Sequence, residues 1–294
     1  MDKGEKEVVI NSKSGLILEG GGMRGLFTAG VTDVMMENGI SYGALVGVSA
    51  GACFGCNYKS NQPGRVLRYN LAYCKDPRYC SVRSLIRTGN MFGTEFCYYD
   101  IPDKLDLFDV ETFEQNSMDF YLVCTDMETG TPIYHKCTST KNPNEMEWIR
   151  ASSSLPFVAQ MVEIDGMKLM DGGVSDSIPI RFAEKMGYEK NVVVLTQPEE
   201  YVKKPASMMG LIRWKFKDYP CFVEAMEQRH EMYNDTVEYI KKQETAGHTF
   251  VIRPPQSLPV GRIEHNPKKL KQAYQMGRDA ATEVLHLLKA FVAG

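Results

Sequence analysis

The sequence predicts an α/β fold whose central sheet is parallel or mixed and is covered by helices on both faces. Segments with strand character alternate along the chain with segments of helical periodicity, as in folds built from strand–helix–strand units. The strand segments are apolar throughout and do not alternate with polar residues, which is typical of strands buried on both faces. With 43% hydrophobic residues among 294, the chain has ample material for such a core.

The first part of the chain supplies strands and helices in alternation. Residues 15–19 are predicted to form a short buried strand, and a glycine break separates it from a helix over about 26–38. Residues 44–48 form the second predicted strand, and the next helix begins at about Ala50. A third helix is expected at 65–73, after a Pro-Gly loop.

The segment 74–116 is expected to be an irregular insertion on the surface, because it combines short apolar pieces with many turn residues. Regular structure resumes after it. The predicted strands are 119–125, 133–135, a hairpin over 162–170, 191–196 and 249–252, and the predicted helices are 144–150, 179–187, 222–244 and 267–291. No repeat or linker divides the chain, so we expect a polar tail over 1–14 and a single domain over 15–294.

Charge and cysteine usage narrow the class of protein. Lys and Arg total 34 against 37 Asp and Glu, a net charge of -3, so the chain as a whole does not attract phosphate and no nucleic-acid partner is expected. Eight cysteines are too few for a secreted disulfide framework. Residues 1–14 mix charges of both signs and contain no apolar core of a signal peptide. We therefore expect a cytoplasmic protein with reduced thiols.

One uncharged stretch, residues 38–58, resembles a membrane span. Its five glycines recur every four residues, as in packed transmembrane helices. Together with two Asn and two Ser, however, these glycines dilute the run below the roughly 20 predominantly apolar residues that a span needs. A buried strand followed by a helix is the better prediction.

A glycine-rich turn follows the first predicted strand. Gly20, Gly22 and Gly25 match the pattern G-x-G-x-x-G between a strand and a helix, the context of a dinucleotide site. Such a site also needs an acidic residue about 20 positions later, and residues 41–46 contain none. A tight structural turn remains open, and so does a set of backbone N–H groups that stabilise a developing anion at the start of a helix.

A candidate nucleophile follows the second predicted strand. Gly47-Val48-Ser49-Ala50-Gly51 matches G-x-S-x-G at a strand-to-helix junction. In this sharp turn Gly47 and Gly51 relieve crowding of the backbone, and the turn presents the Ser49 hydroxyl at the positive end of the next helix. The placement beside a second glycine turn predicts a nucleophile.

The base that would activate Ser49 is less clearly marked. The five histidines lie in helices or beside turns, and only His135, at the end of a predicted hairpin strand, is kept as a reserve candidate. Asp171 is the better candidate, because it follows an apolar strand and precedes Gly172-Gly173, which lets the backbone turn sharply beside the carboxylate. The alternative is that Asp171 merely shapes a turn.

Together these motifs resemble the patatin-like phospholipases. The segments that carry the resemblance are GGGMRG (20–25), GVSAG (47–51), CTDMETG (124–130), ASSSLP (151–156) and DGG (171–173). Their order and separations fit that family, and the resemblance runs from about Gly15 to the end of the chain. Glu19 is a departure, since many members have Asp there, and its side chain is expected to point away from the glycine turn.

The resemblance implies a three-layer α/β/α fold with a mostly parallel sheet and a serine acyl hydrolase that acts on lipid esters. It implies Ser49 as the nucleophile and Asp171 as the general base, with no metal ion and no cofactor. Arg24 would support the anion electrostatically or form a structural ion pair. The oxyanion hole is assigned to the backbone N–H groups of Gly20, Gly21, Gly22, Met23 and Arg24. A lipid- or acyl-binding protein without turnover on the same fold is the alternative.

Two other patterns are interpreted as structural. Cys53 and Cys56 form C-x-x-C on the helix that follows Ser49, and they are expected to be packed reduced thiols, because the next cysteine pair lacks zinc spacing. Aspartates recur every third residue from Asp100 to Asp109. The apolar residues between them indicate a solvated turn and not a calcium loop.

A basic and apolar segment lies at 203–217. It contains five Lys or Arg and no Asp or Glu, interleaved with residues such as Leu211 and Trp214. Cations beside aromatic and aliphatic side chains suit the interface of an anionic bilayer, which predicts a peripheral membrane contact. The alternative is that the apolar residues pack on the core while the cations are solvated.

Overall fold

The computed structural model of the protein describes residues 9–139 and 143–294. Its described strands form one eight-stranded sheet in the order β5-β6-β3-β2-β1-β7-β8, and β4 pairs with β3. The strands are β1 (Val9–Leu18), β2 (Ile40–Val48), β3 (Asp119–Asp126), β4 (Pro132–Lys136), β5 (Val162–Ile164), β6 (Met167–Asp171), β7 (Lys190–Val194) and β8 (Thr249–Ile252). The four pairings among β1, β2, β3, β7 and β8 are parallel, so the prediction of a mostly parallel sheet is confirmed.

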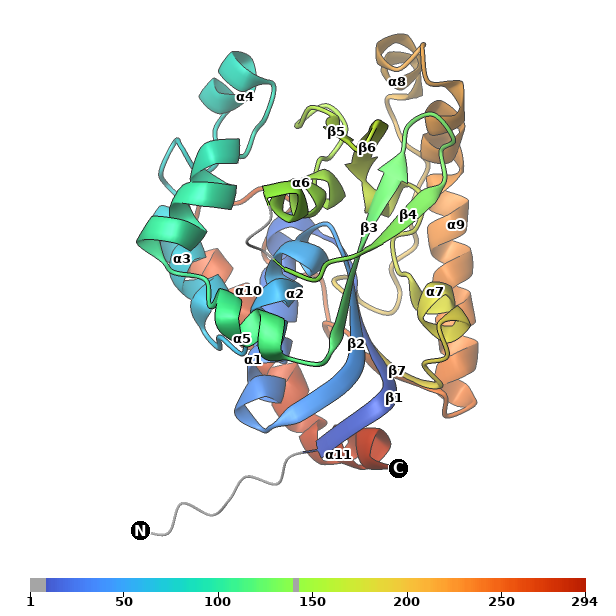
Figure 1. Ribbon diagram of the computed structural model, residues 1–294. Helices are drawn as coiled ribbons and strands as arrows, with labels where there is room; N and C mark the ends of the chain where they lie inside the picture. The colour runs from blue at the N-terminus through green and yellow to red at the C-terminus, as the bar shows by residue number, and fades with distance from the viewer. Residues whose placement is uncertain (1–8, 140–142) are drawn as a thin grey trace.

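Helices cover both faces of this sheet (Figure 1). The longer ones are α1 (Gly25–Glu37), α2 (Ala50–Lys59), α3 (Arg65–Tyr73), α6 (Pro143–Ser152), α9 (Pro220–Thr245), α10 (Pro267–Glu283) and α11 (Leu285–Ala293). The shorter ones are α4 (Val82–Thr88), α5 (Val110–Gln115), α7 (Ile180–Lys185) and α8 (Met209–Lys215). No helix within the described residues is long and apolar enough to cross a membrane.

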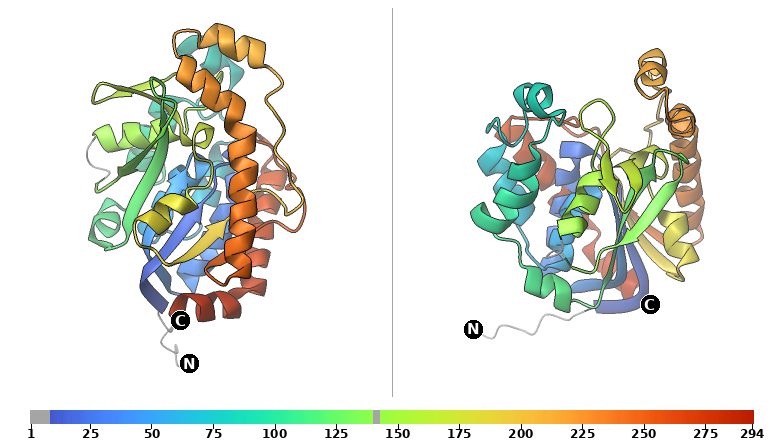
Figure 2. Two further views of the ribbon diagram at one scale, coloured as in Figure 1. Left: turned by 90° about the vertical axis from the view of Figure 1, so that its right-hand side faces the viewer. Right: turned by 45° about the horizontal axis from the view of Figure 1, so that its top comes forward.

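Successive residues of the central strands pack against opposite helical layers. Leu16 and Leu18 of β1 belong to the core that includes residues of α1, α2 and α11. Ile17, between them, packs in the core with residues of α7 and α9. Because both faces are covered, every position in the strand must be apolar, which explains the pattern in the sequence. Figure 2 shows α9 running along one face of the sheet.

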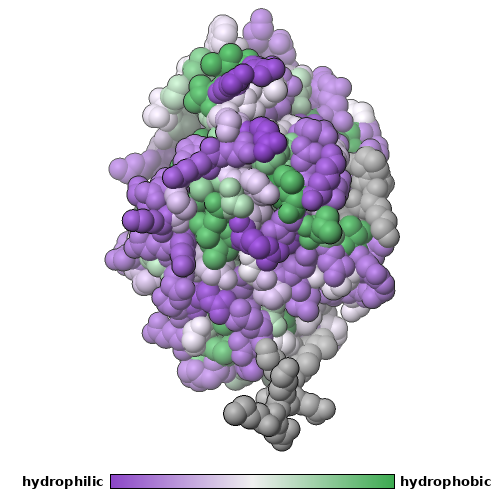
Figure 3. Space-filling model, turned by 90° about the vertical axis from the view of Figure 1, so that its left-hand side faces the viewer, coloured by the Kyte–Doolittle hydropathy of each residue, from purple (hydrophilic) through white to green (hydrophobic). Residues whose placement is uncertain are grey.

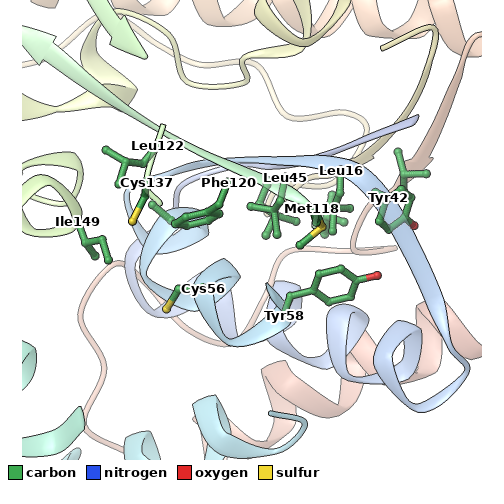
Figure 4. Close-up of a cluster of buried hydrophobic side chains, with 14 of the residues drawn as sticks. Leu16, Tyr42, Leu45, Cys56, Tyr58, Met118, Phe120, Leu122, Cys137 and Ile149 are labelled. Carbon is green, nitrogen blue, oxygen red and sulfur yellow. The ribbon is translucent and has the colours of Figure 1, made fainter. Parts of the chain in front are cut away.

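The larger core lies between the sheet and the helices around α2. Figure 4 shows Leu45, Phe120 and Leu122 of the strands facing Cys56 and Tyr58 of α2. This packing fixes α2 against the strand that precedes it, and the junction between them is the turn that holds Ser49.

The polar tail predicted over 1–14 is too long. Val9 to Asn11 already pair in register with Ile40 to Tyr42 of β2, and β1 resumes this pairing at Gly15. The Asn11 amide also donates to the carbonyl of Val292 at 2.9 Å. The mixed charges of residues 1–14 predicted a tail, but backbone pairing with β2 makes its last part, from Val9, a strand of the sheet.

The segment 74–116 has more regular structure than predicted. It contains α4, a π-helix over Phe96–Leu105 and α5. Asp106 is not part of a solvated turn, because both Arg65 and Arg68 form ion pairs with it. These pairs connect the insertion to α3, a contact between distant positions that no local pattern indicates.

The C-terminal part differs from the prediction at two places. The closing helix is divided at Val284, whose φ of -100° and ψ of 7° end α10, and α11 then runs beside β1 (Figure 1). Leu287 of α11 is 52% exposed. Helix α8 was not expected at all.

Candidate active site

Ser49 lies in the turn between β2 and α2. Its φ of 55° and ψ of -121° place a non-glycine residue in a sparsely populated region. A Cβ at Gly47 would lie 2.6 Å from the carbonyl oxygen of Gly51, and one at Gly51 would lie 2.3 Å from that of Leu18. The turn therefore excludes side chains at both glycines, as the G-x-S-x-G pattern predicts.

Asp171 reaches Ser49 because β2 and β6 pair with the same edge of β3, one directly after the other. Residues of β2 pair with β3 up to Val48 and Val123, and Asp171 pairs with the next β3 residue, Cys124. Strand β4 pairs along the other edge of β3. The Ser49 hydroxyl donates to Asp171 Oδ2 at 2.6 Å, so the two predicted residues meet at the end of the sheet.

The Asp171 carboxylate is held on its second oxygen as well. The Gly173 N–H donates to Oδ1 at 2.8 Å, and the side chain is 1% exposed. Burial raises the pKa of this carboxyl, while the Ser49 hydroxyl and the charge of Arg229 partly oppose the increase. A carboxylate with a raised pKa is a stronger base than a free one.

Ser152 at the end of α6 supports the turn that holds Ser49, although no sequence pattern indicated a role for it. Its hydroxyl accepts from the Ser49 N–H at 3.1 Å and donates to the Val123 carbonyl at 2.7 Å. The residue lies in the ASSSLP segment, but none of its three serines stands out from local pattern.

The glycine turn lies directly against Ser49. A Cβ at Gly20 would lie 2.9 Å from the Cβ of Ser49. The N–H of Met23 donates to the Arg262 carbonyl at 3.1 Å, and that of Arg24 donates to the Gly21 carbonyl at 3.3 Å. Two of the five predicted oxyanion donors are thus already engaged within the fold. Gly20, Gly21 and Gly22 are the candidates that remain.

Glu19 is part of a separate hydrogen-bond group behind the turn. Its carboxylate accepts from the N–H of Thr196 at 2.6 Å and from the hydroxyl of Tyr233 at 2.9 Å. Arg24 forms no ion pair within 4.0 Å among the described residues, and its buried Nε has no hydrogen-bond partner. Arg24 therefore forms no structural ion pair within the described residues.

His135 is engaged elsewhere. Its Nε2 lies 2.8 Å from Glu145 Oε2, and its ring stacks on Trp148 at 4.1 Å. Since the Ser49 hydroxyl bonds to Asp171, the geometry brings the carboxylate and not this imidazole to the serine.

An apolar cavity of about 540 Å³ opens beside Ser49, within the roughly 300–1,000 Å³ usual for small-molecule sites. It extends between α2, the insertion and α8. The aromatic and aliphatic residues that line it include Phe54, Tyr69, Tyr79, Phe92, Tyr98, Ile101, Phe157, Ile212 and Met226. Its size and lining suit a long apolar chain, and apart from Ile212 in the segment 203–217 none of these residues was singled out in the sequence.

The cysteines of the C-x-x-C pattern are free thiols on α2. Burial raises the pKa of Cys53 to about 11 and that of Cys56 to about 12, so both are protonated at neutral pH. Within the described residues, no group of three or more His, Cys, Asp or Glu side chains could hold a metal ion.

Two family descriptions match successive parts of the chain. The patatin-like phospholipase family matches residues 16–184, and a domain of unknown function, DUF6363, matches residues 219–293. Because the first match covers more than half of the chain, the chain belongs to the patatin-like phospholipase family. The predicted resemblance is confirmed.

The individual relatives have low sequence identity to this chain. The uncharacterized protein YjjU of Escherichia coli K12 is 29% identical over 269 residues, which cover 90% of this chain and 74% of YjjU. Lysophospholipase nte1 of Aspergillus terreus is 24% identical over 94% of this chain, but the chain spans only 18% of that protein's length. Among solved structures, VipD from Legionella pneumophila has a TM-score of 0.47 at 10% identity, over 94% of this chain and 67% of that chain.

Proposed function

We propose that this member of the patatin-like phospholipase family is a serine acyl hydrolase that cleaves carboxylic ester bonds of lipids, with phospholipase A or lysophospholipase activity. The observation that carries the proposal is the 2.6 Å hydrogen bond from the Ser49 hydroxyl to Asp171, at the end of an apolar cavity. The fungal relatives named lysophospholipases support the choice of lipid substrate.

Acylation would begin with a proton transfer along this hydrogen bond. Asp171 accepts the Ser49 proton as Oγ attacks the ester carbonyl, and the carbonyl oxygen becomes an anion. The glycine turn next to Ser49 offers backbone N–H groups to that anion. Asp171 then returns the proton to the departing alcohol oxygen, which leaves the acyl group on Ser49.

Deacylation would use the same groups in reverse. Asp171 accepts a proton from water, whose oxygen attacks the acyl carbonyl, and then returns this proton to Ser49 Oγ as the fatty acid departs. The raised pKa of Asp171 favours both proton transfers. None of these steps uses a metal ion or a cofactor.

The acyl chain would occupy the 540 Å³ cavity, since aromatic and aliphatic side chains line it up to Ser49. Burying a chain there removes it from water at about 0.8 kcal/mol for each CH₂ group. This contribution explains how binding energy from the chain could position the ester for attack.

A fluorophosphonate probe tests this function, because it labels only activated serines. We expect wild-type protein to be labelled on Ser49 and Ser49→Ala to remain unlabelled. Ser153→Ala is the matched control, since Ser153 lines the same cavity and its hydroxyl bonds to Tyr98 at 2.6 Å. Binding of lipid without labelling or ester cleavage by the wild type would instead support the non-catalytic alternative.

We also infer a peripheral contact with an anionic membrane at the end of the molecule where the cavity opens. Helices α4 and α8 lie at this end (Figure 1), and Ile86 and Trp214 are 80% and 73% exposed. Figure 3 shows hydrophobic residues at the upper end of the face that carries α4. The exposed cations Arg83, Arg87 and Lys217 complement an anionic surface.

A further inference from the structure

Four cationic side chains gather beside the candidate nucleophile. Arg24, Lys203, Arg229 and Arg262 line a cavity of about 30 Å³ together with Ser49 and Asp171. Lys203, Arg229, Arg262 and Ser49 also line the large apolar cavity. The two cavities therefore meet at Ser49, with apolar walls on one side and positive charge on the other.

No close ion pair neutralises these cations among the residues that the structure describes. In the ranges 9–139 and 143–294, none of the four forms an ion pair within 4.0 Å. The nearby carboxylate of Glu19 is engaged by Thr196 and Tyr233. With Glu19 and Asp171 ionised, four cationic groups face two carboxylates, so the site carries an excess of two positive charges when Lys203 is protonated. Arg24, Lys203 and Arg229 are half-buried, where a cation without an ion pair is costly, so this excess indicates an anionic ligand.

The fold holds the cluster in place without a ligand. The Lys203 backbone N–H donates to Asn234 Oδ1 at 2.9 Å, and the Asn234 amide donates back to the Lys203 carbonyl at 3.0 Å. The Lys203 ammonium lies 4.0 Å from the centre of the Tyr233 ring. Arg229 donates through Nε to the carbonyl of Gly173, so it is fixed to the loop that follows Asp171.

Burial and electrostatic repulsion within the cluster both act on Lys203. Burial and the nearby charge of Arg229 lower the pKa of its ammonium to about 7. An anion among these side chains would relieve the repulsion and restore the charged form.

We propose that Arg24, Lys203, Arg229 and Arg262 bind a phosphate group of the lipid substrate while its ester lies at Ser49. Phosphate fits because it carries up to two negative charges and several acceptor oxygens, which match guanidinium groups in bidentate contacts. The proposal rests on the proposed ester hydrolysis. It names the preferred substrate as an acyl ester with a phosphate close to the scissile bond, in preference to a neutral acylglycerol.

The proposal gives a role to the C-terminal segment. Arg229 and Arg262 both lie within residues 219–293, which match a domain of unknown function. Arg229 comes from α9, and Arg262 comes from the loop between β8 and α10. The Arg262 carbonyl also accepts from the Met23 N–H at 3.1 Å, so this loop rests on the glycine turn. The segment thus supplies one wall of the site.

Binding is tested first in Ser49→Ala protein, where no turnover occurs. Glycerol 3-phosphate and inorganic phosphate should each raise Tm and bind by calorimetry, whereas glycerol should do neither. Arg262→Gln in this background should weaken phosphate binding about tenfold, the effect of losing a charged hydrogen bond. Arg262 is exposed, so the change should not impair folding. Arg181→Gln removes an exposed cation on α7 and should leave binding unchanged.

Hydrolysis then distinguishes a substrate headgroup from a free anion. A 1-acylglycerol phosphate and a 1-monoacylglycerol with the same acyl chain are compared by kcat/KM. Wild type should prefer the phosphate-bearing ester, and Arg262→Gln should reduce this preference about tenfold, while Arg181→Gln keeps it. Arg262-dependent phosphate binding with no preference between the esters would identify a site for free phosphate and overturn the proposal.

The failure of this proposal is distinguishable from that of the proposed function. If wild type cleaves neither ester, the hydrolase assignment is wrong, and the binding experiment still decides whether phosphate occupies the cluster. If both esters are cleaved equally well and phosphate does not bind, the phosphate site is wrong and the hydrolase assignment stands.

Discussion

At the scale of single residues, the pKa of Asp171 controls the pH dependence of the proposed reaction. Burial raises this pKa, and the carboxyl must be ionised to accept the Ser49 proton. We therefore expect kcat/KM for a short-chain ester to fall as the pH drops through a midpoint above 3.9, the usual value for Asp. An acid limb at the usual value would show that burial does not tune this base.

The same raised pKa affects stability, which provides an independent readout. A carboxyl whose pKa is higher in the folded state contributes stability below its unfolded pKa and loses it as pH rises through the folded value. Ionised Asp171 thus lowers the free energy of unfolding at neutral pH. Asp171→Asn should raise Tm at pH 8 and abolish activity, and the gain should vanish at acidic pH. A lower Tm at pH 8 would contradict the expected sign.

Substitution of Gly22 tests whether catalysis depends on the position of the glycine turn. The φ of Gly22 is +58°, and an added Cβ would lie 2.3 Å from the Arg262 carbonyl. Gly166, with φ +78° and no atom within 4 Å, is a matched control, because an alanine there has the same cost of about 1–2 kcal/mol for a left-handed conformation. Gly22→Ala should lower kcat about 100-fold by displacing the turn, while Gly166→Ala keeps it. Equal kinetics in the two variants would remove the turn from the mechanism.

Much of the candidate site could be predicted from local sequence. Ser49 and its flanking glycines form a turn that only small residues permit, and Asp171 precedes two glycines, so each carries a local signal. Ser152 and Arg262 carry none, because they reach the site through α6 and through a loop more than 200 residues after the glycine turn. Local sequence patterns do not indicate residues that reach the site through long-range contacts.

At the scale of elements, α8 shows features of both interpretations of segment 203–217, because one of its apolar residues packs in the core and another is exposed. Ile212 is buried in the core, while Leu211 is 40% exposed. Leu211→Ala should weaken binding to anionic vesicles roughly fivefold, from lost apolar burial. Leu287→Ala is the control, since Leu287 is 52% exposed on α11 at the opposite end of the molecule (Figure 1). Equal effects of the two changes, or binding that resists high salt, would contradict a contact at this end.

The correctly predicted elements are those whose packing follows the hydrophobic periodicity of their own sequence. The helix expected at 65–73 is α3, and the hairpin turn at Asp165-Gly166 has positive φ at both residues, as a two-residue turn requires. The π-helix over Phe96–Leu105 contains Pro102, which argues against a helix in any local interpretation. Lys203 was counted with the membrane-facing cations, but it lines the cavity beside Ser49, where it contacts Tyr233 and Asn234.

At the scale of the whole molecule, we infer that the sheet and its helices, from Val9 to the end of the described residues, form one domain. Elements of the C-terminal segment cover both faces of the sheet, with α9 on one and α10 and α11 on the other. Unfolding followed by far-UV and near-UV circular dichroism should give coincident transitions. Two separated transitions, one confined to 219–294, would show that this segment is an independent unit.

The central claim is that Ser49 and Asp171 act as one catalytic unit in ester hydrolysis. The most direct test measures release of fatty acid from a lysophospholipid by Ser49→Ala, Asp171→Asn and the double variant, each confirmed as folded. Residues that act in one step are non-additive, so each single variant should lose nearly all activity, and the double variant should be no worse than either. Losses that multiply in the double variant, or an active Asp171→Asn enzyme, would contradict the account.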